Sequence, residues 1–414
     1  MNISEILLEL WNSSGFVGLT MHWQNIVMIC IACVLLYLAI VRKFEPLLLV
    51  GISFGMLLAN LPFSGMMHME LFQGDPAAID YGRILHQGGL LDILYLGVKL
   101  GIYPCLIFMG IGAMTDFGPM IARPSSILLG AAAQLGVYAA FILAIILGFD
   151  GKEAASIGII GGADGPTAIF LTTMLAPHLL GPIAVAAYSY MALIPLIQPP
   201  IMKMLTTQKE REVVMTQAAP VSKTTKVIFP IAVTIFIILV LPSVAPLIGC
   251  LMMGNLLREC GVVERLSDTV QNTMMNIVTI FLSFSVGATS VGYLPKEIAA
   301  DGTIINAVNI GFLSLDTIKI IILGLLAFSF STFGGVLFGK IMYKLSGGKI
   351  NPLIGSAGVS AVPMAARISQ VVGSKYNPSN YLLMHAMGPN LSGVIGSAVA
   401  AGFLLSVARA LRWV

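Results

Sequence analysis

Charged residues are scarce in this sequence. Of its 414 residues only 10% are Asp, Glu, Lys or Arg, while 57% are hydrophobic, and the mean hydropathy is +0.94. Because a soluble globular domain carries about 25% charged residues, this composition excludes a soluble protein and predicts an integral membrane protein with many spans. The net charge of +3 is too small to indicate a nucleic-acid partner.

Cysteine is also scarce, and its distribution excludes a thiolate metal centre. The five cysteines lie in or beside apolar segments without metal-ligand spacing, so we expect reduced packing residues: Cys30, Cys33, Cys105, Cys250 and Cys260. The five histidines are equally scattered, and none is assigned a metal. Met1–Val17 has no basic start and carries Glu5 and Glu9, so no cleavable signal is predicted.

Apolar segments of membrane-helix length recur along the chain. The predicted spans are Asn25–Val41, Pro46–Leu61, Leu91–Met114, Ser125–Phe149, Leu179–Leu196 (ending at Pro199–Pro200), Val227–Leu241, Pro246–Leu257, Thr269–Ala288, Ser314–Tyr343 and Tyr381–Val407. We therefore predict an N-terminal tail or interfacial helix over 1–24, a first membrane repeat over 25–200, a cytoplasmic linker over 201–226 and a second membrane repeat over 227–414.

One apolar segment, 153–175, cannot form an unbroken helix. It contains Gly161, Gly162 and Gly165, followed directly by Pro166, and these residues open a helical backbone. Opened backbone in a membrane is tolerated only where protein or a water-filled cavity satisfies its polar groups. The same stretch carries Asp164, and an ionisable side chain at such a place is a functional-site hypothesis by default.

A second broken stretch, Asn351–Val371, repeats the pattern of the first. Aligned without gaps, GKEAASIGIIGGADGPTA (151–168) and GKINPLIGSAGVSAVPMA (348–365) share glycines, a lysine and a proline at the same places. Pro46-Leu47 and Pro246-Leu247 also open similar spans. An odd number of crossings per half gives two repeats of inverted topology. We therefore predict an all-α polytopic fold whose two broken, re-entrant helices meet near the membrane midplane.

Basic segments give the orientation. Lys and Arg in short loops favour the cytoplasm, which places the 201–226 linker inside and the acidic loop over 62–90 outside. Arg42-Lys43, Arg123 and Lys340–Lys349 agree with this assignment only if the broken segments turn back rather than cross. Arg409 and Arg412 then fall outside, against the rule.

Asp164 is the leading candidate for a Na⁺ or H⁺ site. Carboxylate and freed carbonyl oxygens suit a hard cation, although an Asp at such a break can simply cap the following half-helix. The second break has no carboxylate and supplies neutral oxygens from Asn351, Ser356 and Ser360. Asn390, beside Gly388-Pro389, supplies another.

Other polar residues leave alternatives open. Arg367 either reaches the membrane interface or provides a fixed positive charge that binds an anion or pairs with Asp164, where it would compete with Na⁺. Tyr190 is either a hydroxyl near the site or a packing tyrosine. Structural ion pairs or boundary charges are expected at Asp116, Lys99, Asp316 and Lys319.

The motifs GGADGPTAIF, GAMTDFGPMI and NPLIGSAGVSAVPMAARISQ are long and unusual. With them, roughly residues 25–410 resemble the β subunit of the biotin-dependent sodium-translocating decarboxylases, which act on oxaloacetate, methylmalonyl-CoA or glutaconyl-CoA. The resemblance implies a bacterial inner-membrane subunit that decarboxylates carboxybiotin, consumes a proton and exports Na⁺. Its implied partners are a biotinylated carrier, a carboxyltransferase α subunit, a small single-span γ or δ subunit and further copies of itself. Carboxybiotin would be presented by the carrier and not attached to this chain.

The resemblance also implies roles for individual residues. Catalytic roles fall on Asp164, Arg367, Tyr190 and Ser360, with Arg367 contacting carboxybiotin, and Na⁺ ligation falls on Asp164, Asn351, Gly355, Ser360 and Asn390. Two rival functions fit the composition: a secondary cation/solute transporter without chemistry, and a membrane anchor for a soluble carboxyltransferase. An anchor has no reason to carry a buried aspartate and two broken helices.

Overall fold

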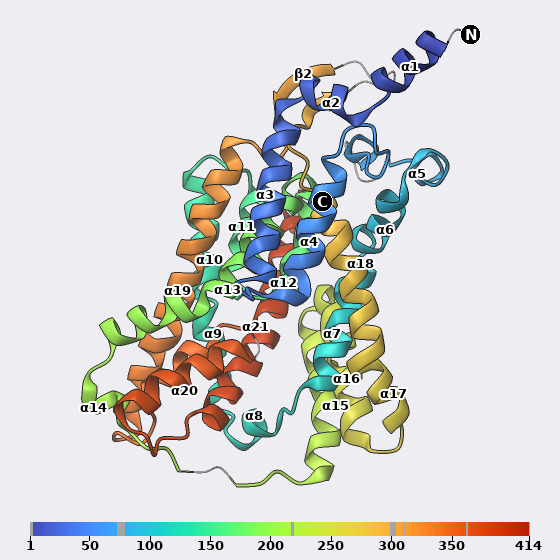
Figure 1. The fold of residues 1–414 in the computed structure, drawn as a ribbon. Helices are drawn as coiled ribbons and strands as arrows, with labels where there is room; N and C mark the ends of the chain where they lie inside the picture. The colour runs from blue at the N-terminus through green and yellow to red at the C-terminus, as the bar shows by residue number, and fades with distance from the viewer. Residues whose placement is uncertain are drawn as a thin grey trace.

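The computed structural model describes residues 3–72, 79–216, 219–298, 304–309, 311–361 and 363–413. In these ranges the protein is helical apart from one hairpin (Figure 1). The elements up to the linker are α1 (Ile3–Asn12), α2 (Gly15–Met21), α3 (Trp23–Ile40), α4 (Pro46–Ala59), η1 (Met69–Phe72), α5 (Tyr81–Gln87), α6 (Leu90–Lys99), α7 (Ile102–Met114), α8 (Gly118–Ala122), α9 (Ser126–Ala133), α10 (Leu135–Ile146), α11 (Gly151–Gly158), η3 (Ile159–Gly162), α12 (Gly165–Leu175), η4 (Pro177–Leu179), α13 (Leu180–Leu205) and α14 (Gln208–Arg211).

The second half has a similar order of elements. They are α15 (Lys223–Val240), η5 (Pro242–Val244), α16 (Ala245–Cys260), α17 (Glu264–Thr269), η6 (Val270–Met274, a π-helical turn), α18 (Met275–Ala288), β1 (Pro295–Ile298), β2 (Ile304–Asn309), α19 (Leu315–Leu345), η7 (Pro352–Gly358), α20 (Met364–Tyr376) and α21 (Leu383–Ala410). The antiparallel β1–β2 hairpin was not predicted.

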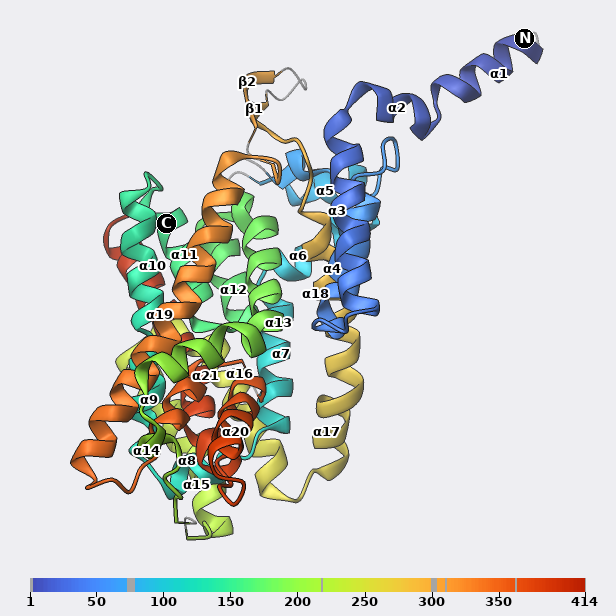
Figure 2. The same ribbon diagram turned by 60° about the vertical axis from the view of Figure 1, so that its left-hand side comes forward.

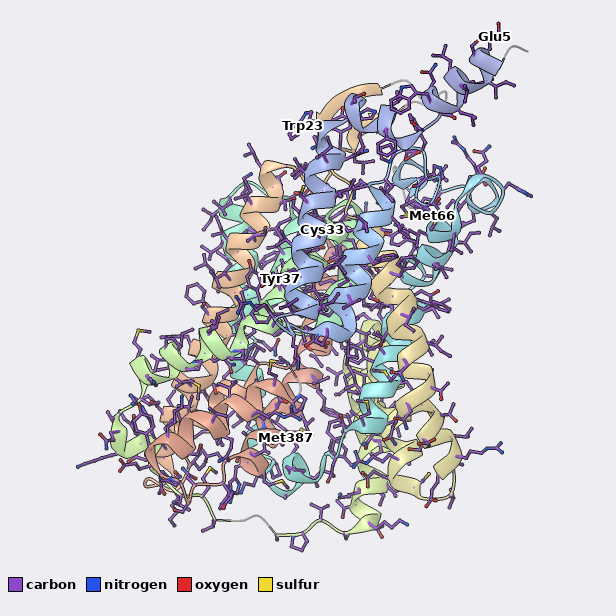
Figure 3. The ribbon with its side chains drawn as sticks, in the orientation of Figure 1. Glu5, Trp23, Cys33, Tyr37, Met66 and Met387 are labelled. Atoms are coloured by element: carbon purple, nitrogen blue, oxygen red, sulfur yellow. The ribbon has the colours of Figure 1, made fainter. Side chains whose placement is uncertain are left out.

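The membrane-protein prediction is confirmed, but fewer helices are long enough to span than the hydropathy predicted. Among the described residues six helices pass by length and composition, or seven if the bent pair α6–α7, with its 62° angle, is one span. The predicted spans at Pro46–Leu61 and Pro246–Leu257 are the shorter helices α4 and α16. Helix α3 is the most exposed of the spans in the first half, and Figure 3 shows Trp23, Cys33 and Tyr37 along it.

The predicted end of the fifth span at Pro199–Pro200 is wrong. Helix α13 continues through Pro195, Pro199 and Pro200 as far as Leu205. Membrane helices tolerate proline because neighbouring groups satisfy the carbonyls that it frees, and the helix bends instead of stopping. In Figure 2 its C-terminal part turns sideways toward α14.

The first broken segment is a buried re-entrant hairpin. Helices α11 and α12 pack against each other, and every residue from Ala154 to Thr173 is buried. Glu153 at its entry lies 3.0 Å from His178, just after its exit, measured between Oε1 and Nε2. Both ends of the hairpin are therefore on one side of the bundle, and protein rather than lipid surrounds the opened backbone.

The second broken segment also turns back. Asn351 before η7 and Asn380 after α20 donate to the same Val213 carbonyl, at 2.9 and 2.8 Å. Its tip meets the first hairpin, because the Ser360 hydroxyl donates to the Gly162 carbonyl at 2.7 Å. The two hairpins thus touch at their tips. The Glu153–His178 pair joins the ends of the first hairpin, and Val213 of the linker joins the ends of the second.

Glycines let helices of the first half approach helices of the second half closely at two contacts. A β-carbon on Gly55 or Gly287 would lie 2.0 Å from a carbonyl oxygen across the α4–α18 contact. One on Gly112 or Gly254 would lie 1.9 or 1.8 Å from a carbonyl across the α7–α16 contact. The predicted repeat and its inverted topology stay predictions.

Candidate cation site at the meeting of two broken helices

The backbone around Asp164 is opened as the sequence predicted. After α11 the chain makes the 3₁₀ turn η3, and Ala163 then adopts the left-handed conformation with φ 52°. Only a constrained environment holds a non-glycine residue there. Helix α12 starts at Gly165, with Pro166 in its first turn. Asp164 therefore lies at a helix N-terminus, where the macrodipole favours a negative charge.

The Asp164 side chain is 6% exposed, and its Oδ2 atom accepts hydrogen bonds from two hydroxyls. Thr167 Oγ1 lies at 2.5 Å and Ser397 Oγ, on α21, at 3.0 Å. The backbone N–H of Thr167, in the first turn of α12, also points to the carboxylate, although the stricter geometry of a capping hydrogen bond is not met. The capping interpretation therefore stays open beside a cation role. No described basic residue forms an ion pair with Asp164.

Serine hydroxyls satisfy the carbonyls that the break frees. Ser331 on α19 donates to Gly161 O at 2.6 Å, and Ser360 donates to Gly162 O at 2.7 Å. Ser360 therefore lies beside the Asp164 turn, as the site prediction requires. The hydroxyl oxygens keep lone pairs that remain available to a cation.

Two side-chain oxygens nearby are buried without a hydrogen-bond partner. Asn390 on α21 donates its amide to Ala357 O and Val359 O, both at 2.9 Å, and its Oδ1 accepts from no described residue. Gln134, between α9 and α10, also has an unpartnered Oε1, which would lie 3.8 Å from a β-carbon on Gly162. Such atoms need an explanation, and an oxygen-ligated cation provides one.

Gln134 was not predicted from the sequence. The signal was a lone amide in the apolar run 125–149, and the helix is in fact interrupted at that residue.

Asn351 faces the linker rather than Asp164. Its amide donates to Arg211 O at 3.0 Å and Val213 O at 2.9 Å, and its Oδ1 accepts from Leu353 N–H at 3.0 Å. The amide NH₂ group holds the linker, while Oδ1 accepts one hydrogen bond and keeps a second lone pair. Its role as a cation ligand stays a prediction.

Tyr188 faces the opened turn at Gly165, while Tyr190 packs in the same buried cluster as Ile160 and Ala163, and its functional role stays a prediction. The Tyr190 hydroxyl donates to the Ile321 carbonyl on α19. Tyr188 is 1% exposed, and its hydroxyl has no described hydrogen-bond partner. A β-carbon on Gly165 would lie 2.4 Å from that hydroxyl oxygen, and the group is within electrostatic range of Asp164.

The other predicted residues form no hydrogen bond or ion pair with Asp164 within the described parts of the chain. Arg367 is exposed on α20, and no described residue pairs with it. Gly355 allows close packing, since a β-carbon there would lie 2.0 Å from Gly335 O. Ser356 is hydrogen-bonded to Ser369 at 2.9 Å. Their functional roles stay predictions.

Three of the four charges for which ion pairs were expected form them. Asp116 pairs with Lys226 at 2.7 Å, and Asp316 pairs with Lys319 at 2.8 Å. Burial raises the pKa of Asp116, but hydrogen bonds from Lys226 and Gly118 and the charges of Lys226 and Arg258 outweigh it, so the pKa is lowered overall. Lys99 has no ion pair among the described residues.

A single buried carboxylate between two opened backbones is the arrangement that the sequence motifs predicted. A family model described as the Na⁺-transporting oxaloacetate decarboxylase beta subunit matches residues 24–408. The chain belongs to this family. The resemblance inferred from the motifs is confirmed, and the family assignment favours the decarboxylase function over a plain secondary transporter.

Several relatives of this family match the chain over nearly its full length. The methylmalonyl-CoA decarboxylase subunit beta of Propionigenium modestum is 57% identical, covering 97% of this chain and 99% of the relative. The glutaconyl-CoA decarboxylase subunit beta of Acidaminococcus fermentans is 56% identical, covering 97% of each. The oxaloacetate decarboxylase beta chain of Klebsiella pneumoniae is 49% identical, covering 93% of this chain and 95% of the relative.

Replacing Tyr188 with Phe should raise the Na⁺ concentration that half-saturates decarboxylation about five- to tenfold, because one hydroxyl is lost beside the carboxylate. The measurement is the Na⁺ dependence of CO₂ release by the purified complex. Tyr138→Phe, on the exposed face of α10, is the matched control. An unchanged half-saturation, or a larger rise with Tyr190→Phe, would show that Tyr188 has no part in the site.

Proposed function

We propose that this chain decarboxylates carboxybiotin, consumes a proton and exports Na⁺ across the bacterial cell membrane. The observation that carries the proposal is the burial of Asp164 where the two broken helices touch. An unpaired carboxylate in a membrane costs at least about 2.5–3.5 kcal/mol on insertion scales. A bound Na⁺ or proton would offset that cost, and the two would compete for the same oxygen atoms.

The chemistry needs no nucleophile from this chain. In carboxybiotin the carboxylate is attached to a ureido nitrogen. When the N–C bond breaks, CO₂ leaves, the electron pair stays on nitrogen, and nitrogen takes up one proton. We propose that Asp164 and its hydroxyl neighbours pass that proton when Na⁺ has left, and that Ser360, Asn390 and Gln134 complete the Na⁺ ligands.

The proposed partners are those that the family resemblance implies. A biotinylated carrier must present carboxybiotin, a carboxyltransferase α subunit must load it, and a small single-span γ or δ subunit and further copies of the chain complete the complex. The basic linker and Arg123 would face the cytoplasm, where the carrier works.

The experiment that tests the function is Na⁺ uptake by proteoliposomes containing the complex purified with its native partners. Donor addition should drive uptake, and avidin, which sequesters biotin, should block it. Uptake that persists in avidin would support the rival secondary transporter. Donor-driven CO₂ release without any Na⁺ movement would support the rival membrane anchor.

We further propose that the carboxyl donor is a CoA thioester. Relatives named for methylmalonyl-CoA or glutaconyl-CoA are 56–57% identical to this chain, and those named for oxaloacetate are 47–49% identical. The native complex should therefore release CO₂ from methylmalonyl-CoA or glutaconyl-CoA at least about tenfold faster than from oxaloacetate. A preference for oxaloacetate would contradict this assignment.

A further inference from the structure

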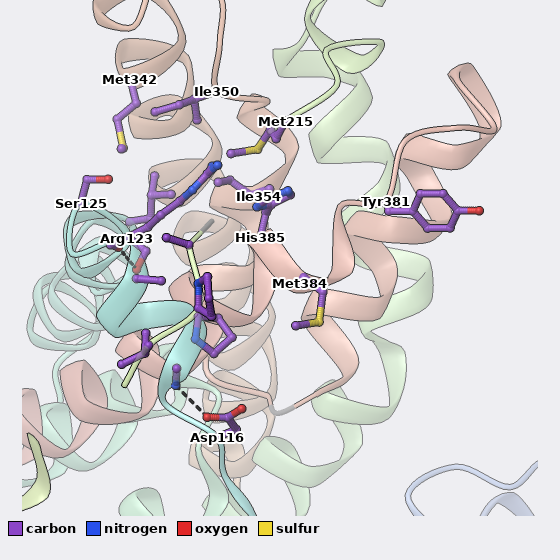
Figure 4. Close-up of a pocket in the computed structure, with 18 of the residues that line it drawn as sticks. Asp116, Arg123, Ser125, Met215, Met342, Ile350, Ile354, Tyr381, Met384 and His385 are labelled. Atoms are coloured by element: carbon purple, nitrogen blue, oxygen red, sulfur yellow. Dashed lines mark hydrogen bonds between the residues drawn. The ribbon is translucent and has the colours of Figure 1, made fainter. Parts of the chain in front are cut away.

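A large cavity lies beside the linker, and Asp164 is not among the residues that line it. Its volume is about 1110 Å³, at the upper end of the roughly 300–1,000 Å³ typical of small-molecule sites. Figure 4 shows its lining from α8, α9, α21 and the linker. Met215, Met342, Met384, Leu129 and Ile354 provide an apolar lining, and methionine adapts readily to ring-shaped ligands.

The cavity carries an excess of positive charge. Asp116 and Lys226 neutralise each other at 2.7 Å, while Arg123 has no ion-pair partner among the described residues. His385 lies within electrostatic range of Arg123. Partial burial lowers the pKa of the Arg123 guanidinium, so an incoming carboxylate would stabilise its charged form.

The linker holds Arg123 in place in the wall of the cavity. Arg123 donates to the Thr216 carbonyl and lies 3.5 Å from its hydroxyl. The preceding linker backbone is held in turn, since Asn351 and Asn380 both donate to Val213 O. A guanidinium that is positioned in this way keeps further N–H donors for a ligand.

The floor of the cavity includes part of the hairpin that reaches the cation site. Leu129 and Ile354, from α9 and η7, line it. On the same hairpin, a β-carbon on Gly358 would lie 2.5 Å from Leu129 O, and Ser360 contacts Gly162 beside Asp164. A ligand bound against Leu129 and Ile354 would therefore contact the second hairpin, which in turn contacts the first broken segment.

We propose that this cavity receives the carboxylated ureido ring of the carrier, and that Arg123 binds its carboxylate. The inference rests on the proposed function and names a binding site for its substrate. The ligand must combine an anionic carboxylate on a ureido ring with a fused apolar thioether ring on a long arm. The carboxylate matches the guanidinium of Arg123, which is unpaired among the described residues, and the apolar part matches the Met and Leu lining. Arg367, the residue that the family resemblance implies for this role, does not line the cavity.

The kinetic test uses Arg123→Gln in the assembled complex, with the isolated carboxylated carrier as substrate. Loss of a charge-assisted hydrogen bond should raise the KM for the carrier about ten- to hundredfold, while the half-saturating Na⁺ concentration stays as in the wild type. Arg123→Lys should recover part of the loss, because it keeps the charge. Arg265→Gln, an exposed arginine on α17 that does not line the cavity, is the control and should keep the wild-type KM.

The outcomes separate this inference from the function itself. If the wild-type complex releases no CO₂ from the carboxylated carrier, the proposed function fails. If the wild type is active and Arg123→Gln keeps its KM, or Arg367→Gln alone raises it, the assignment of Arg123 is overturned. If Arg123→Gln does not assemble, the decision passes to a labelling experiment that leaves Arg123 in place.

That experiment places a thiol in the cavity with Met384→Cys and, for comparison, on the outer face of α20 with Arg367→Cys. Labelling by a charged maleimide is measured against the native-cysteine background of the wild type. Carboxylated carrier at about four times its dissociation constant occupies about 80% of the cavities, so it should slow labelling at 384 about fivefold and should leave 367 unchanged. Protection at 367 alone, or at neither position, would overturn the proposal.

Discussion

Replacing Asp164 with Asn should reduce Na⁺-dependent decarboxylation and Na⁺ uptake by at least about 100-fold, the low end of what a positioned proton-transfer group contributes. Asparagine has nearly the same shape and can still accept hydrogen bonds from Thr167 and Ser397. It has neither the negative charge that would hold Na⁺ nor a proton to exchange. Fold and assembly should therefore survive while pumping is lost.

The control for this variant is Asp316→Asn. Asp316 is half-exposed at the start of α19 and pairs only with its neighbour Lys319, and an exposed pair of this kind contributes little to stability. It should behave as the wild type. Retention of Na⁺-dependent activity by Asp164→Asn would remove the basis of the proposed mechanism.

Replacing Gly254 with Ala should destabilise the folded subunit by about 1–3 kcal/mol, as expected for a carbon inserted into a closed contact. The new β-carbon would lie 1.8 Å from Met109 O on α7, so the two helices must separate. Small residues at such crossings let membrane helices approach closely. The measurement is the thermal unfolding midpoint of the purified protein in detergent.

Gly249→Ala on the same helix is the matched control, because nothing lies within 4 Å of its added β-carbon. It should leave the midpoint unchanged or raise it, since alanine favours helix over glycine. Equal effects of the two substitutions would show that the α7–α16 contact is not closely packed.

The breaks in the membrane helices could be predicted from sequence because their cause is local. Gly161, Gly162, Gly165 and Pro166 act on the backbone directly, and the turn through Ala163 to Asp164 lies where they place it. The same logic failed at Pro199 and Pro200. There α13 continues through both prolines, as membrane helices can where neighbouring groups satisfy the freed carbonyls, and the prolines alone do not reveal this.

Side-chain direction was harder to predict. Tyr188 and Tyr190 are two residues apart on α13 and so point to nearly opposite sides of the helix. Which of them faces Asp164 is decided by how α13 packs between α12 and α19, and that is a tertiary property. Asn351 is a similar case, because the linker that occupies its amide lies 138 residues away in sequence from it.

The central claim is that Na⁺ and a proton exchange at one carboxylate. It is tested most directly by adding Na⁺ to the purified, weakly buffered subunit and following the pH, with K⁺ as the control ion. The wild type should release protons in proportion to the Na⁺ bound, more so as the starting pH is lowered, and Asp164→Asn should release none. Na⁺ binding without proton release at any pH, or equal release from the variant, would contradict the account.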